Sequence, residues 1–151
     1  MDKSEKAREL FLQGLLCSSS VFAAFAPDFG VDEADALKIG SCMGSGLCKS
    51  EVCGACLGAL MALGLKYGQC DAADKAARQA SNRVRDVFLD AFAKENGSFN
   101  CRDLLEFDLG DPVQAAEARS RGLFTAVCPK MVASAAKIVD QIMLDNPLNE
   151  E

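Results

Sequence analysis

The chain of 151 residues contains no histidine. It therefore lacks the imidazole ligand that many zinc, copper, iron and nickel sites use. A c-type haem at the Cys53–Cys56 pair is excluded as well, because its attachment motif needs a histidine directly after the second cysteine, and Leu57 stands there. A transition-metal site in this chain would rest mainly on sulfur.

Residues that favour strands are also scarce. Valine, isoleucine and threonine together number thirteen, whereas alanine is abundant, so the composition excludes a sheet protein and favours helices. Long apolar runs are missing too. The longest, residues 52–65, is shorter than the roughly 20 residues of a membrane span. The N-terminal residues lack the pattern of a secretory signal, and we therefore expect a cytoplasmic protein with no membrane partner.

Positive charge is in the minority. Sixteen Lys and Arg residues are dispersed among twenty-two Asp and Glu, which gives a net charge of −6. This balance argues against nucleic acid as a partner. Half of the residues are hydrophobic and the length suits one compact unit, so we expect a single cysteine-rich helical domain over residues 1–151. The sequence does not identify a redox partner protein, and it does not decide between a monomer and a homodimer.

The apolar periodicity predicts an all-α fold, a bundle of about six to eight helices. At its centre we expect a helix over about residues 51–66, apolar on all sides, in which Gly54 and Gly58 let neighbouring backbones approach closely. The other predicted helices are one capped by Ser4, one over 17–25, one capped by Asp32, a long one over about 72–95, one over about 113–121, and a last one that begins near Cys128.

The chain does contain eight cysteines. In a reducing cytosol such thiols are more often metal-binding or catalytic than structural. Cys53 and Cys56 are three residues apart on a predicted helix, which suits two ligands of one metal site or a redox couple whose thiol pKa the helix N-terminus lowers. Any single cysteine can equally be a small buried core residue.

Three further cysteines stand where helices are predicted to begin, namely Cys17, Cys101 and Cys128. The free N–H groups and the positive dipole end of a helix N-terminus stabilise a thiolate. Together with Cys53, these residues supply four thiols from four separate segments, and they could converge on one point of the bundle.

This pattern resembles the C-GCAxxG-C-C family of putative redox-active proteins. The resemblance covers nearly the whole chain: FLQG-x2-C at residues 11–17, Cys-Gly-Ala-x-x-Gly at 53–58, then GALMALGLKYG, GSFNCRDLL and a cysteine opening the last helix. It implies a helical redox protein whose characteristic cysteines fall on Cys17, Cys53, Cys101 and Cys128. The central motif reads Cys-Gly-Ala where the family name has Gly-Cys-Ala. Four cysteines are additional to the family set: Cys42, Cys48, Cys56 and Cys70.

Three functions follow from these thiols. The first is a metal centre for electron transfer, redox sensing or catalysis, with an iron–sulfur cluster as the first choice and Zn or Cu(I) as alternatives. Its candidate ligands are Cys17, Cys53, Cys101, Cys128, Cys56, Cys42, Cys48 and Cys70.

The second function is metal-free thiol–disulfide chemistry with Cys53 as the reactive thiol. The third is a structural zinc site, which ranks last because four-cysteine zinc sites usually combine two close pairs and this chain has one. Whether the protein is an oxidoreductase or an electron carrier stays open at this point.

Overall fold

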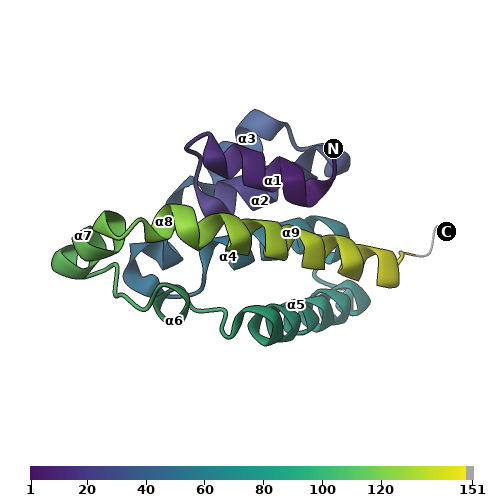
Figure 1. The fold of residues 1–151 in the computed structure, drawn as a ribbon. Coiled ribbons are helices and arrows are strands. Elements are labelled where there is room, and N and C mark those ends of the chain that lie inside the picture. Colours follow the sequence, from purple (N-terminus) through teal and green to yellow (C-terminus); the bar gives the residue numbers. More distant parts are fainter. Residues whose placement is uncertain (149–151) are drawn as a thin grey trace.

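The computed structural model describes residues 1–148 and is all-α, as the composition predicts (Figure 1). Within these residues the one extended pairing is an isolated bridge between Val52 and Asn100. The helices are α1 (Lys3–Leu12), α2 (Cys17–Phe25), α3 (Glu33–Ile39), α4 (Gly54–Tyr67), α5 (Lys75–Asn96), α6 (Cys101–Leu105), α7 (Pro112–Ser120), α8 (Leu123–Ala126) and α9 (Cys128–Asp145).

Aspartates cap several helices. The predicted cap of the first helix, Ser4, is wrong: the Asp2 carboxylate accepts the Glu5 N–H at 2.9 Å, and the Ser4 hydroxyl donates to the same carboxylate. Asp2 prevails because it stands just before the first helical residue, where a side-chain oxygen can reach the free N–H groups. Asp32 caps α3, as predicted. Asp74 and Asp111 cap α5 and α7 in the same way.

The central helix, α4, begins at Gly54, later than the sequence predicts. The residues before it are extended because they pair with the segment that precedes α6. The Cys53 N–H donates to the Phe99 carbonyl at 2.8 Å, and the Cys101 N–H donates to the Glu51 carbonyl at 2.7 Å. This short ladder fixes the start of α4 beside the start of α6.

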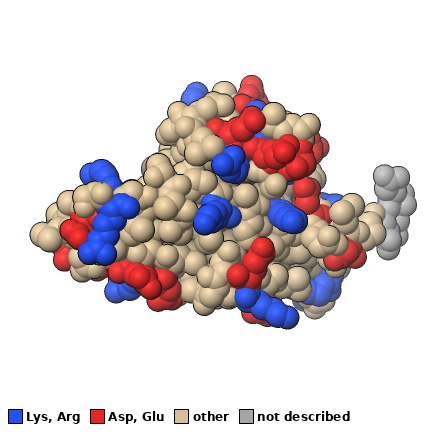
Figure 2. Space-filling model, viewed as in Figure 1, with Lys and Arg blue, Asp and Glu red and all other residues tan. Residues whose placement is uncertain are grey.

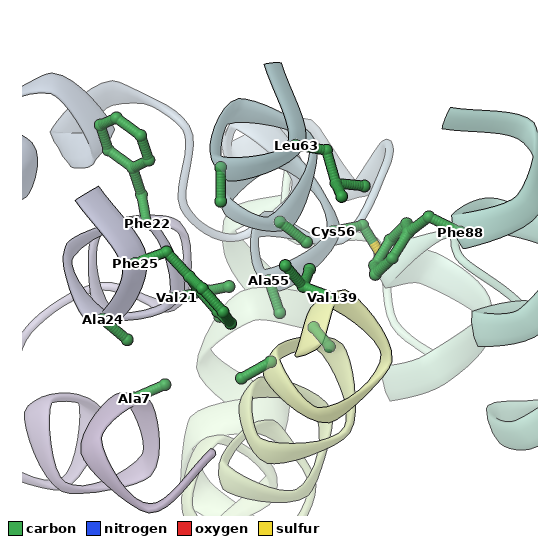
Figure 3. Close-up of a cluster of buried hydrophobic side chains, with 14 of the residues drawn as sticks. Ala7, Val21, Phe22, Ala24, Phe25, Ala55, Cys56, Leu63, Phe88 and Val139 are labelled. Carbon is green, nitrogen blue, oxygen red and sulfur yellow. The ribbon is translucent and has the colours of Figure 1, made fainter. Parts of the chain in front are cut away.

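The core lies where α4 packs between α2, α5 and α9 (Figure 3). Gly58 sits at the crossing of α4 with α2, and a Cβ atom there would collide with the Ser18 carbonyl oxygen. The close approach predicted for this glycine is therefore confirmed. Fully buried side chains that surround α4 include Val21, Phe25, Phe88, Phe92, Val132 and Val139.

The two longest helices, α5 and α9, pack against α4 and against each other, and each buries one face. In α5, the Phe88 and Phe92 rings stack at a centroid distance of 5.9 Å. Gly97 ends α5 in the left-handed region at φ 94°, as its position after the helix predicts. Helix α1 covers α9 and α2 from the other side (Figure 1).

Charges of both signs are interspersed over the face drawn in Figure 2, with broad uncharged areas between them. Among residues 1–148, no single helix is both long and apolar enough to cross a membrane; one pair, Pro112–Ser120 with Leu123–Asp145, reaches that length and composition only jointly and is bent by 59°.

Candidate functional site

Four cysteines from distant parts of the chain line one cavity of about 370 Å³. Three of them are the first residues of their helices, Cys17 in α2, Cys101 in α6 and Cys128 in α9. Cys53 is the residue that caps α4. Each thiol thus stands at a helix N-terminus, where free N–H groups and the helix dipole favour negative charge. The convergence expected from the four segments is observed.

Gly54 brings the Cys17 thiol against the start of α4. A Cβ atom at residue 54 would collide with Sγ of Cys17 and would lie 3.0 Å from the Met43 carbonyl oxygen. The residue after Cys53 therefore cannot carry a side chain in this arrangement. This explains why the motif reads Cys-Gly-Ala in this chain.

The loop before α4 contains a turn of left-handed backbone. Residues 45–48 have φ values of 57°, 59°, 62° and 55° in succession. Such conformations cost L-amino acids roughly 1–2 kcal/mol per residue, and consecutive ones are rare. The turn is closed by hydrogen bonds from the Cys48 N–H to the Gly44 carbonyl at 3.2 Å and from the Glu51 N–H to the Gly46 carbonyl at 3.0 Å.

This left-handed turn places polar groups against the cavity thiols. The Ser45 N–H lowers the pKa of Cys17, and the nearby Ser50 hydroxyl lowers the pKa of Cys101, each against the larger effect of burial. The Ser50 hydroxyl itself donates to the Phe107 carbonyl at 3.1 Å and accepts the Leu109 N–H at 2.7 Å. The strained backbone thus has a local role, because it aims these groups at two of the four sulfurs.

Buried serines of α2 anchor the other end of the same loop. The Ser18 hydroxyl donates to the Gly40 carbonyl at 2.7 Å, and the Ser19 hydroxyl donates to the Leu37 carbonyl at 2.8 Å. Each hydroxyl adds a hydrogen bond to a carbonyl at the end of α3; the same two carbonyls also accept the Met43 N–H and the Ser41 hydroxyl. The loop is therefore tied to α2, the helix that carries Cys17.

The thiol pKa values reflect burial and mutual repulsion. Burial, and after it the charge of Cys53, raise the pKa of Cys17 to about 11. The pKa values of Cys101 and Cys128 rise to about 12, from burial first and then from neighbouring thiolates. Each thiolate makes ionisation of the others harder, so the four cannot be charged together without a compensating positive charge.

Cys53 behaves in the opposite way. A hydrogen bond from the Cys56 thiol lowers the pKa of Cys53, and the N–H groups of Ala55 and Cys56 lower it further against the effect of burial. Burial and the charge on Cys53 raise the pKa of Cys56. Cys56 is fully buried outside the cavity lining, and Figure 3 shows its sulfur beside the ring of Phe88. Cys53 is the preferred thiolate of the pair.

These shifts predict that the reduced, metal-free protein loses stability at high pH. Above the ordinary thiol pKa of 9.0, an unfolded chain ionises while Cys17, Cys101 and Cys128 keep their protons in the folded state. The folded state then binds more protons, so the free energy of unfolding falls as pH rises from about 9 to about 12, by at most about 1.4 kcal/mol per pH unit for each thiol.

Cys53, whose pKa is lowered, gains its stabilising effect below that pH window and does not offset the loss. Urea denaturation at several pH values would measure the effect, with Cys17→Ala as the variant that should show a smaller decline. A free energy of unfolding that stays constant from about pH 8 to about pH 11 would contradict it.

The remaining cysteines are exposed and do not line the cavity. Cys48, in the left-handed turn, is close enough to raise the pKa of Cys101. Cys42 lies in the 3₁₀ turn Gly40–Cys42. Cys70 follows the C-terminal end of α4, and fourteen residues of helix separate the two ends by about 20 Å. The structure thus divides the candidate ligands into four that meet, two that adjoin them (Cys56 and Cys48) and two outside.

The spacing of the thiols bears on the kind of metal. In the part of the chain that the structure describes, no three Cys, Asp or Glu side chains are close enough to share one metal ion. A tetrahedral zinc site with Zn–S bonds of about 2.3 Å needs sulfurs about 3.8 Å apart. The four thiols that line the cavity form an all-sulfur donor set, the kind that iron–sulfur clusters, zinc and copper(I) accept.

Sequence reasoning missed much of the wall of this cavity. Phe11 and Leu15 pack against the core and also line the cavity, together with Leu104, Phe124 and Met131. Ser45 and Ser50 carried no signal in the sequence. Only the neighbouring glycines hinted at unusual backbone in this loop.

Fold and site together define a class: a small all-α protein with a cluster of thiols at helix N-termini. Residues 15–142 match the family described as putative redox-active protein (C_GCAxxG_C_C), and the chain belongs to that family. Neither the curated proteins nor the solved structures contain a match to this chain. The family, with its many cysteines, supports a redox role.

Proposed function

We propose that the protein is a redox protein in which Cys17, Cys53, Cys101 and Cys128 hold an iron–sulfur cluster. The observation that supports this is their convergence on one cavity from four helix N-termini. Four cysteine thiolates are the usual ligands of such clusters, which when bound supply one-electron chemistry.

The chain contributes three things to this proposed site. The helix N-termini and the Ser45 N–H stabilise negative charge on sulfur. The apolar wall lowers the polarity around the sulfurs. The mutual repulsion of the thiolates makes the set dependent on positive charge at its centre. We further propose a cytoplasmic location, because the eight free cysteines require a reducing compartment.

Anaerobic purification followed by iron and sulfide analysis and a visible absorption spectrum tests this proposal. We expect iron and sulfide in comparable amounts and broad absorption that bleaches on reduction. The same analysis reports zinc and copper. A colourless preparation without metal, with all eight thiols titratable, would overturn it.

A dithiol function is the second candidate, favoured by the Cys53–Cys56 pair. The hydrogen bond between the thiols and their opposed pKa shifts suit an attacking thiolate beside a resolving thiol. Attack by Cys53 on a substrate disulfide would release one substrate thiol. Attack by Cys56 on the mixed disulfide would then release the second thiol and leave Cys53 and Cys56 joined.

A further inference from the structure

The cavity extends beyond the four sulfurs along an apolar wall. Phe11 and Leu15 from α1 and the turn after it face Leu104 and Leu105 of α6, with Met131 of α9 nearby. Its volume of about 370 Å³ lies in the range of small-molecule sites, roughly 300–1,000 Å³. Apolar side chains would ordinarily close such a space in a core of native density.

No Lys, Arg, Asp or Glu side chain lines the cavity. Its polar groups are the four thiols, two hydroxyls and backbone. One of the hydroxyls, on Thr125, already donates to the Gly122 carbonyl at 2.9 Å. An anionic ligand would lose its hydration without gaining a positive counter-charge here, and that transfer costs several kcal/mol. The lining therefore selects against anions.

Large apolar side chains also stand at the edge of the cavity and remain accessible to solvent. Leu12 is 53% exposed and Leu16 is 41% exposed, and both contribute to the lining. Thr125, on the side of α8, is exposed as well. The cavity is thus open to solvent at this edge, so a small molecule can enter it without any rearrangement of the core.

We propose that this cavity binds an uncharged, apolar small molecule and holds it against the four thiols. The redox centre then meets a small-molecule partner directly, within the cavity itself. The proposal goes beyond the assignment of a metal to the thiols, and it holds for either of the two chemistries considered for them.

The test uses two fluorescent probes that share one skeleton. N-phenyl-naphthylamine is uncharged, whereas anilinonaphthalene sulfonate carries a negative charge. Both are titrated into the anaerobically purified full chain, with iron measured in the same sample so that the metal question is answered separately. We expect the uncharged probe to bind at least about tenfold more tightly than the sulfonate. Comparable binding of the two probes would overturn the proposal.

Variants locate the binding. Leu12→Asp places a charge at the rim and should weaken binding of the uncharged probe at least about fivefold, whereas Leu144→Asp, at a leucine that is 75% exposed and outside the lining, should leave it unchanged. Thr125→Trp, at an exposed position, should obstruct the cavity in a second way. The bound probe should also slow alkylation of Cys128 relative to Cys70. Unchanged affinity in Leu12→Asp and Thr125→Trp would contradict the proposal.

Discussion

Cys53→Ser should abolish the proposed iron–sulfur centre, whereas Cys70→Ser should leave it in place. Cys53 caps α4 and is the cavity thiol with the lowered pKa, so its replacement takes away the ligand that ionises most readily. Cys70 is exposed and lies beyond the far end of the same helix. We expect iron per chain to fall at least about tenfold in Cys53→Ser and to match the wild type in Cys70→Ser.

Cys56→Ala separates the two candidate functions. Its thiol lies outside the cavity lining, so a cluster held by the four cavity thiols should survive the change, with a modest shift because Cys53 loses a hydrogen bond. Dithiol chemistry requires Cys56 and would be abolished. If the wild-type protein contains no iron and the Cys56→Ala substitution abolishes its disulfide reductase activity, the dithiol function is established. Full iron content in Cys53→Ser would contradict the proposed ligand set.

Gly58→Ala lowers the free energy of unfolding by about 2 kcal/mol. The new methyl group would collide with the Ser18 carbonyl oxygen and would lie 3.1 Å from Cβ of Val21. Neither contact can be relieved by rotating a flexible side chain, because one partner is backbone and the other is the root of a β-branched residue in α2. The two helices must therefore separate, which also displaces Cys17 at the start of α2.

Gly64→Ala is the matched control within the same helix. A Cβ atom at residue 64 has nothing within 4 Å, so the substitution should gain the helix propensity of alanine and stabilise the protein by about 0.5–1 kcal/mol. Urea denaturation of both variants measures the difference. Equal effects of the two substitutions would show that helix propensity, and not the crossing with α2, governs these positions.

Much of this arrangement could be predicted, because helix starts leave local signals. The cysteines at residues 17, 101 and 128 follow turns or precede proline, and periodic apolar residues come after them. Their convergence could only be suggested, since it depends on how helices far apart in the chain pack. The start of α4 shows the same limit: Glu51 to Cys53 looks helical in the sequence but pairs with residues 99–101.

The left-handed turn could not be predicted at all. Leu47 and Cys48 have no intrinsic preference for positive φ, so their conformation is imposed by the hydrogen bonds around them. The apolar cavity was hidden for a related reason. Phe11 and Leu15 have the spacing of core residues, and spacing does not reveal whether the space in front of them is filled.

The distribution of the four thiols along the chain has a consequence for synthesis. Cys17 emerges from the ribosome early, whereas Cys128 emerges only with the last helix. A nascent chain therefore has three of the four thiols until α9 begins, and the fourth is the first residue of the helix that completes the core. A chain truncated before residue 128 cannot carry the full set.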